Sequence, residues 1–396
     1  MKATTLAMEH LMCAVGDPLA DLRNITPDDP GYARAQLIRA ATGIIAKSPA
    51  AFPAIADAIR SLEGLSPTKQ TRAHISAAEA WISGNPVLAA KSYASIVVQW
   101  PRDVLALRLA QSCYFYLGRH DRLCAIVDAI LPAWQQDWRG YGHVLAIASY
   151  AHAENGEAAH AEMLGRQALA IDAACPLGVH SVAHAMAEAG RPADGARWMR
   201  DQAAHWASES RMRTHNAWHL GMFDADEGDL PSALAILDRW LLPASADCAL
   251  DACDATALLW RLTPYGLDDP ARWSRLSDAF EATVDPGFWP FVDLHAAFAH
   301  LNAGRVARAH SLSRQIDRCA AGFDYAALRA RHITQPGLRA LNAWAACRYA
   351  EAANRLRDLR PVLSEMGGSH VQLEIFASIE REASRRQHHD LRLKAA

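Results

Sequence analysis

The chain has 396 residues, about half of them hydrophobic, with 40 basic and 43 acidic residues and a formal net charge of −3. A charge balance so close to neutral gives no electrostatic footprint for nucleic acid and no attraction to anionic lipid, so neither partner is expected. No stretch approaches the roughly 18 uninterrupted apolar residues of a membrane helix, and none is predicted.

The first residues, MKATTLAMEHLMCAVGDPLADLRN, are apolar but interrupted by Glu9 and His10, and no small-residue cleavage site follows them. No signal peptide is therefore expected. The eight cysteines occur singly, without a CxxC pair, which favours neither a zinc ribbon nor a disulfide framework. Each cysteine is expected to be a small buried hydrophobe, and the reducing cytoplasm is the expected compartment.

Residues 1–62 are predicted to form N-terminal helices, since 33–62 read as one or two helices after the turn ITPDDPG. Residues 63–383 are predicted to form one superhelical domain of helical repeats. Residues 384–396 are a charged C-terminal end that is expected to fray. Strand-like alternation is nearly absent, whereas Ala-, Leu-, Glu- and Arg-rich segments with helical spacing fill the chain.

A motif of small and apolar residues that ends in glycine recurs along the chain, with consecutive copies separated by 34 or 38 residues. The marker glycines are Gly84, Gly118, Gly156, Gly190, Gly228, Gly266 and Gly304, and a last copy has Cys347 in their place. Thirty-four is the period of the tetratricopeptide repeat. We expect two helices to approach closely at each glycine, and the four extra residues of longer copies to lengthen a helix. The predicted fold is all-α: a tetratricopeptide-like superhelix with a concave central pocket.

Histidines follow the same frame when they are counted back from each marker glycine. His184 lies 6 residues before its glycine, His180 lies 10 before, His219 and His295 lie 9 before, and His143 and His215 lie 13 before. Steps of three and four residues place these positions on one face of a helix, which we expect to face the concave side. Pairing alone is a weak signal, because a lone histidine on a helix is more often structural; the alignment across repeats is the stronger one.

Carboxylates, an amide and aromatic residues accompany this stripe. Asp254 and Asp293 lie 12 and 11 residues before their glycines, but Asp293 and His295 point in different directions on one helix. Helix N-termini favour carboxylates, so either aspartate has a plain structural explanation. The predicted substrate-binding residues are His184, Asn216, Trp218, Asp254, Trp260, Asp293 and His143, with the core as the alternative for each tryptophan.

Four segments in this region, taken together, resemble the tetratricopeptide repeat protein 38 family of bacteria and animals. They are HSVAHAMAEAGR, HNAWHLGMFDADEGDLPSALAILD, DACDATALLWRL and FVDLHAAFAHLNAGR, between residues 180 and 305. The resemblance implies a helical-repeat fold and places His180, His184, His215, Trp218, His219, Asp254, Asp293 and His295 at the family's signature positions. A departure at Gly221–Phe223 should affect packing only. The family has no agreed activity.

Three classes of function remain open from the sequence. The first is an enzyme that uses His219, His295, His180 and His215 for acid–base chemistry on a small metabolite in the pocket. The second is a scaffold that binds a peptide or protein partner, the common role of the fold. The third is a metalloenzyme, with zinc or another divalent metal held by His180, His184, His215 and His219, although HExxH is missing. No nucleotide or redox cofactor motif occurs, and exposed solenoid ends allow a homodimer.

Overall fold

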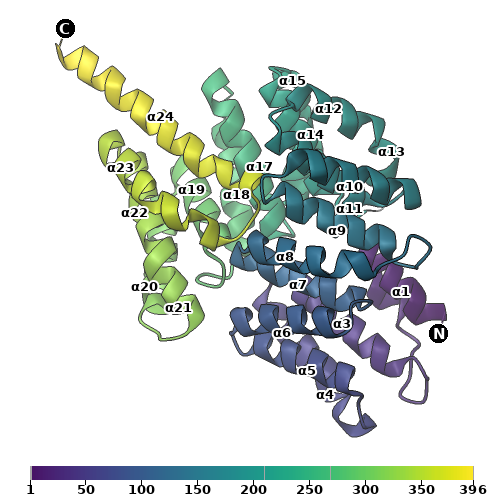
Figure 1. Ribbon diagram of the computed structural model, residues 1–396. Helices are drawn as coiled ribbons and strands as arrows, with labels where there is room; N and C mark the ends of the chain where they lie inside the picture. The colour runs from purple at the N-terminus through teal and green to yellow at the C-terminus, as the bar shows by residue number, and fades with distance from the viewer. Residues whose placement is uncertain (1, 209, 268, 396) are drawn as a thin grey trace. The chain divides into compact units, whose positions relative to one another are not determined.

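The computed structural model describes residues 2–208, 210–267 and 269–395, with side chains up to residue 389 (Figure 1). The described residues form helices joined by short turns and contain no strand. The chain divides into two compact units, Met1–Asn216 and Ala217–Ala396. The division falls within one continuous helix, α14 (Arg213–Asp226).

The first unit is a series of helices in which successive members pack on one another. Its helices are α1 (Lys2–Cys13), α2 (Pro18–Asp21), α3 (Tyr32–Ala46), α4 (Phe52–Arg60), α5 (Lys69–Ile82), α6 (Pro86–Gln99), α7 (Val104–Leu117), α8 (His120–Ile130), α9 (Tyr141–Ala153), α10 (Ala158–Ile171), α11 (Pro176–Glu188), α12 (Pro192–Asp201) and α13 (Ala203–Trp206). Helices α9, α10 and α11 lie side by side, each in contact with the other two (Figure 1).

The second unit repeats this arrangement of packed successive helices. Its helices are α15 (Leu230–Ile236), α16 (Leu242–Ala244), α17 (Ala249–Leu262), α18 (Pro270–Thr283), α19 (Pro290–Asn302), α20 (Val306–Ala320), α21 (Tyr325–Arg329), α22 (Gln335–Ala345), α23 (Tyr349–Leu359) and α24 (His370–Ala395). The predicted charged end, 384–396, continues α24 to Ala395, and its side chains beyond residue 389 lie outside the described residues. The all-α, tetratricopeptide-like fold is therefore confirmed, whereas the concave pocket stays a prediction.

All seven marker glycines share a left-handed backbone conformation, with φ between 63° and 82°. A Cβ built at six of them, Gly84, Gly156, Gly190, Gly228, Gly266 and Gly304, meets no atom within 4 Å. The expectation that helices approach closely at these glycines is therefore wrong for those six. Glycine recurs there because the chain must leave each helix through the left-handed region, which costs a side-chain-bearing residue energy. Cys347 adopts φ 56° at the equivalent place in the last copy.

The close approach occurs instead at a glycine inside a helix. A Cβ on Gly165 of α10 would lie 2.5 Å from Cγ2 of Val182 and 2.8 Å from Oγ of Ser149. Ser149 of α9 donates to Ala161 O at 2.7 Å, and Ser181 of α11 donates to Ala146 O at 2.8 Å. These contacts fix α9, α10 and α11 against one another, so side chains on α9 and α11 meet in a defined geometry.

The 38-residue copy between Gly118 and Gly156 does not contain longer helices, so that prediction is wrong for this copy. The 34-residue copy between Gly84 and Gly118 holds two 14-residue helices, α6 and α7. The 38-residue copy that follows holds α8 with 11 residues and α9 with 13. Its additional residues lie in the connection 131–140, which begins with a 3-10 turn. A connection absorbs an insertion without disturbing helix packing, which explains this placement.

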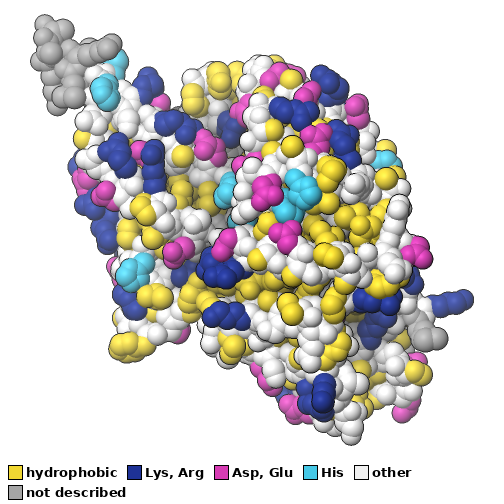
Figure 2. Space-filling view, viewed as in Figure 1, with side chains coloured by type: hydrophobic (Ala, Val, Ile, Leu, Met, Phe, Trp, Pro, Cys, Tyr) yellow, Lys and Arg dark blue, Asp and Glu magenta, His cyan; other side chains and the backbone are white. Residues whose placement is uncertain are grey.

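On the face visible in Figure 2, basic and acidic side chains are interspersed, as the near-neutral net charge predicts. Within the part of the chain that the structure describes, no helix is both long enough and apolar enough to span a bilayer.

Candidate metal centre

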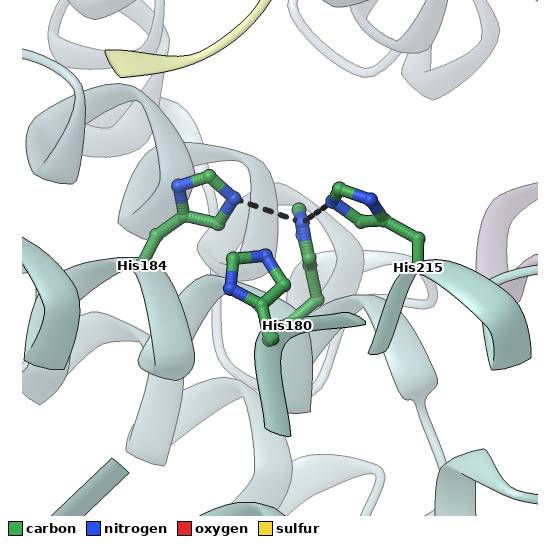
Figure 3. Close-up of side chains that lie close together, drawn as sticks. His180, His184 and His215 are labelled. Carbon is green, nitrogen blue, oxygen red and sulfur yellow. Dashed lines mark hydrogen bonds between the residues drawn. The ribbon is translucent and has the colours of Figure 1, made fainter. Parts of the chain in front are cut away.

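Three of the predicted histidines meet in the first unit. His180 and His184 are one turn apart on α11, and His215 lies in the first turn of α14. The Nε2 atom of His180 is 2.9 Å from Nε2 of His184 and 3.0 Å from Nε2 of His215 (Figure 3). Three imidazole nitrogens from two helices therefore point toward one place.

Glu154, directly after α9, contacts this group through the ring nitrogen of His184 that faces away from His180. Its Oε1 accepts a hydrogen bond from Nδ1 of His184 at 2.8 Å, and its Oε2 lies 3.6 Å from Nε2 of His120. The Glu154 side chain is completely buried. A carboxylate at neutral pH only accepts hydrogen bonds, so Nδ1 of His184 carries the proton. In neutral His184, Nε2 then presents a lone pair to His180 and the centre of the cluster.

Hydrogen bonds alone cannot satisfy all three ring nitrogens in this geometry. One proton on Nε2 of His180 can be directed at His184 or at His215, but not at both. A second proton would place an imidazolium among buried rings, since His184 is 1% exposed and His180 is 6% exposed. A cation bound by the lone pairs of all three nitrogens removes this conflict.

Tyr150 of α9 covers the cluster on one side. Its ring is stacked on His180 with centroids 6.0 Å apart and meets the edge of His184 at 5.1 Å. Its buried hydroxyl has no hydrogen-bond partner among the described residues. Burial raises the pKa of this hydroxyl well above its ordinary value, so it stays a neutral donor.

A positive charge lies in the same region. Burial lowers the pKa of Arg108, on α7, to about 10, and the electrostatic influence of Tyr150 and Cys175 opposes that fall. The guanidinium therefore keeps its charge at neutral pH. Its only described hydrogen bond runs from Nη1 to Oε1 of Gln111 at 2.9 Å. Arg108 and the Tyr150 hydroxyl thus supply a charged donor and a neutral donor in this part of the first unit.

Two further predicted residues of the first unit have other surroundings. Asn216 is fully buried, and its Nδ2 donates to the Pro176 carbonyl oxygen at 3.5 Å, linking α14 to the start of α11. His143 lies at the N-terminal end of α9, where both ring nitrogens are 3.9 Å from Sγ of Cys13. Its neighbours are cysteines, so His143 belongs to a different cluster from the three histidines.

A third group in the first unit, Cys124, His152 and Glu157, looks similar on residue types alone. Nδ1 of His152 lies 3.0 Å from Glu157 Oε2, and its Nε2 lies 3.1 Å from Asp128 Oδ1. Both ring nitrogens therefore lie beside carboxylates, and those of Glu157 and Asp128 are largely exposed, so this group is less enclosed than the three histidines.

In the second unit, the predicted residues of α14 and α17 are part of packed helices. Trp218 and His219 are buried neighbours on α14 with ring centroids 4.8 Å apart, and His219 lies one turn after His215. Asp254 on α17 accepts a hydrogen bond from Nε2 of Gln372 at 2.9 Å. Nε1 of Trp260 donates to Oγ of Ser378 at 3.1 Å. Both α17 side chains thus fasten α24 to α17.

Asp293 and His295 are also buried, on α19. Asp293 accepts from the Gly287 N–H at 3.1 Å, and burial raises its pKa to about 8. His295 donates from Nδ1 to the Phe291 carbonyl oxygen at 2.7 Å and packs against the rings of Phe291 and Phe376. Burial lowers the pKa of His295 to about 4, so it is neutral at pH 7.

Glu154, Tyr150 and Arg108 were not among the residues predicted from the sequence. The repeat frame contained a signal for two of them, since Tyr150 lies 6 residues before Gly156 and Arg108 lies 10 before Gly118. These are the positions that His184 and His180 occupy before Gly190. This match was not predicted because only histidines were compared at these frame positions. Glu154, two residues before Gly156, lies outside the frame positions used and had no such signal.

No protein-family model matches the chain. It is similar to the Cut9–Hcn1 hetero-tetramer of the APC/C, at 10% identity and TM-score 0.47 over 96% of this chain and 69% of that one. A Rap protein complexed with competence and sporulation factor matches at 10% identity and TM-score 0.45, over 97% and 98% of the two chains. The human IFIT1 dimer with m7Gppp-AAAA matches at 13% identity and TM-score 0.39, over 94% and 97%.

These neighbours are helical repeat proteins of tetratricopeptide type, and the helix pairs and left-handed turns described above place the present chain in that class of fold. Likenesses this distant carry no inference about a ligand or partner. The resemblance to the tetratricopeptide repeat protein 38 family stays a prediction.

Proposed function

We propose that this helical repeat protein binds a divalent metal of the zinc type through His180, His184 and His215. The observation that carries the proposal is the meeting of three Nε2 atoms, 2.9 Å and 3.0 Å from the central one. Zinc bound at ~2.0–2.1 Å in a tetrahedron holds its nitrogen ligands about 3.3–3.4 Å apart. The rings therefore need to separate by only a few tenths of an ångström.

The second support is the Glu154 carboxylate on the far side of His184. Metal-binding histidines commonly donate their other ring N–H to a carboxylate, which fixes the tautomer and makes the metal-binding nitrogen more basic. The 2.8 Å contact from His184 Nδ1 to Glu154 Oε1 has this form. Because Glu154 is completely buried, its charge favours a cation nearby.

A zinc ion held by only these three histidines keeps one position open, which is typical of catalytic rather than structural zinc sites. A bound ion of this kind supplies Lewis acidity and lowers the pKa of a water molecule at the open position. Arg108 and the Tyr150 hydroxyl would orient an anionic small molecule there, since the first keeps its positive charge and the second stays a donor. The proposed class is thus metal-assisted chemistry on a small anionic metabolite.

The two other classes of function fit these residues less well. Acid–base chemistry by imidazole alone leaves unexplained why three ring nitrogens crowd together when a proton on Nε2 of His180 can serve only one of its two neighbours. A peptide-binding scaffold needs side chains that a peptide can reach, whereas His184 and Glu154 are buried. A tetratricopeptide-type partner site elsewhere on the chain would be compatible with a metal centre.

The test is zinc binding by untagged, chelator-stripped protein, measured in competition with a chromophoric chelator. We expect His180→Ala to abolish the site that His180, His184 and His215 form. Glu154→Gln keeps all three ligands and should weaken binding by about 10–100-fold, the usual effect of losing an outer-shell partner. His310→Ala removes an exposed histidine of α20 and should leave the zinc affinity unchanged.

Circular dichroism checks that each variant is folded, and His215→Gln, which changes a half-buried residue, serves if His180→Ala does not fold. Equal zinc affinity in His180→Ala and His310→Ala would overturn the proposal. So would wild-type protein that binds zinc no better than millimolar while retaining a peptide or protein partner, which would favour the scaffold.

A further inference from the structure

A second cluster of metal-binding side chains lies at the N-terminal edge of α9 and α11. Cys13 ends α1, His143 lies in the first turn of α9, Asp172 directly follows α10, and Cys175 directly precedes α11. One ligand atom from each of Cys13, His143 and Cys175 lies within 4.8 Å of the others. Three elements of the first unit thus contribute a ligand atom to one group.

Asp172 lies beside Cys13 of this cluster. Sγ of Cys13 donates to Oδ2 of Asp172 at 3.6 Å and lies 3.9 Å from both ring nitrogens of His143. A tetrahedral zinc ion with ~2.3 Å bonds to sulfur and ~2.0 Å bonds to nitrogen or oxygen separates its ligand atoms by about 3.5–3.8 Å. The spacing from Cys13 is already close to that range.

The access to this cluster also suits a metal. Cys175 is 3% exposed, whereas Cys13 and His143 are only half-buried, so an ion can enter from the side of α1. Two thiolates and an imidazole form a soft donor set that selects zinc over magnesium or calcium. The expectation that every cysteine is buried is wrong for Cys347, which is exposed, and for Cys13, Cys248 and Cys319, which are half-buried.

We infer that Cys13, His143 and Cys175 form a second zinc site, distinct from the three-histidine centre. Asp172 lies outside this ligand set and contacts it through Cys13. Zinc replaces the two thiol protons on binding, and it joins the end of α1 to α9 and α11. The same end of the chain is held by the Arg211 N–H, which donates to the Ala14 carbonyl oxygen at 2.7 Å. A zinc ion would thus fasten the N-terminal helix to the repeats.

Cobalt substitution tests this inference independently of the proposed function. A cobalt–thiolate bond absorbs in the near ultraviolet, whereas cobalt bound only by histidine does not. Reduced, metal-free wild-type protein should gain this absorption at one equivalent of Co²⁺, and zinc should displace it. Cys13→Ser and Cys175→Ser should each weaken or shift the band, and the double variant should lose it.

Matched controls separate the two sites. Cys347→Ser, which changes an exposed cysteine, and His180→Ala should both retain the thiolate band. Total zinc should fall from two equivalents to one in the Cys13→Ser/Cys175→Ser variant and, separately, in His180→Ala. A band that persists in the double cysteine variant, or no band in folded wild-type protein, would overturn the inference. A loss of two titratable thiols that dithiothreitol restores would also overturn it, in favour of a disulfide.

Discussion

The three-histidine group of the first unit and the Asp293–His295 segment of the second bury their polar side chains in different ways. In the first unit, His180, His184 and His215 turn their ring nitrogens toward one another, and Glu154 holds His184 from behind. In the second, His295 donates to the carbonyl oxygen four residues before it on its own helix, and Asp293 accepts a nearby backbone N–H. The first group satisfies its polar atoms across helices, and the second satisfies them locally.

This difference shows what a repeat frame can and cannot predict. A shared position before the marker glycine fixes the direction in which a side chain leaves its helix. The neighbouring helix decides what that side chain meets. His180 meets His215, whereas His295 meets the rings of Phe291 and Phe376. An aligned histidine is therefore a candidate ligand only where the adjacent helix also presents a polar group.

The largest expected effect is a loss of stability in His295→Ala, which tests whether His295 is structural, unlike the three histidines of the first unit. The side chain is 1% exposed and packed against two aromatic rings, so its removal leaves a cavity. We expect the free energy of unfolding to fall by about 3 kcal/mol, near the values for other large buried rings. Urea unfolding followed by circular dichroism measures this, with zinc affinity expected to stay at the wild-type value.

His180→Ala provides the opposite pattern, with zinc binding at the three-histidine centre lost. A His295→Ala variant that unfolds like wild type but loses metal or metabolite binding would break the comparison. It would return His295 to the role of a catalytic residue that the sequence pattern indicated.

The next effect is a pH dependence of stability in the second unit. The pKa of Asp293 is raised to about 8 by burial, so the folded chain binds an extra proton between its ordinary pKa of 3.8 and pH 8. Stability from this group is present at low pH and is lost as pH rises toward 8, by about 1.4 kcal/mol per pH unit. Burial lowers the pKa of His295 from 6.5 to about 4, so the stability that neutral His295 contributes to the folded chain is lost as pH falls below 6.5.

The two trends oppose each other below pH 6.5, so of these two groups only Asp293 contributes between pH 6.5 and 8. Over that interval, Asp293→Asn should make the pH slope of stability in urea unfolding more positive than in wild type by about 1.4 kcal/mol per pH unit, since an amide oxygen can still accept from Gly287 but does not titrate. Asp57→Asn, at an exposed carboxylate, is the matched control. An unchanged pH slope in Asp293→Asn would show that Asp293 is ionised in the folded chain.

Much of the fold followed from the sequence because glycine spacing and helical periodicity are local signals. The positions of the marker glycines were predicted correctly, but the structural reason for glycine at these positions was not. Close packing was expected there, and the left-handed turn is what requires glycine. The close approach at Gly165 involves Ser149 and Val182 on two other helices, which no local pattern in the sequence relates to it.

The candidate site was predictable in part for the same reason. His180 and His184 are one turn apart, and His215 followed from the repeat frame. The Cys13 cluster had no sequence signal, because Cys13 and His143 are 130 residues apart and come from different helix ends. Likewise, the contact between Glu154 and His184 depends on the packing of α9 beside α11, which the sequence does not show.

The smallest expected effect is that of Tyr150→Phe, which tests whether the first unit keeps polar groups for a ligand. The Tyr150 hydroxyl is buried without a hydrogen-bond partner among the described residues, and an unsatisfied buried group costs stability. Replacing it with hydrogen should raise the free energy of unfolding by up to about 1 kcal/mol and leave zinc affinity unchanged. Urea unfolding and the chelator competition measure both. A loss of more than about 1 kcal/mol would mean that the hydroxyl supports the fold, in which case the first unit would use its buried polar groups as the second unit does.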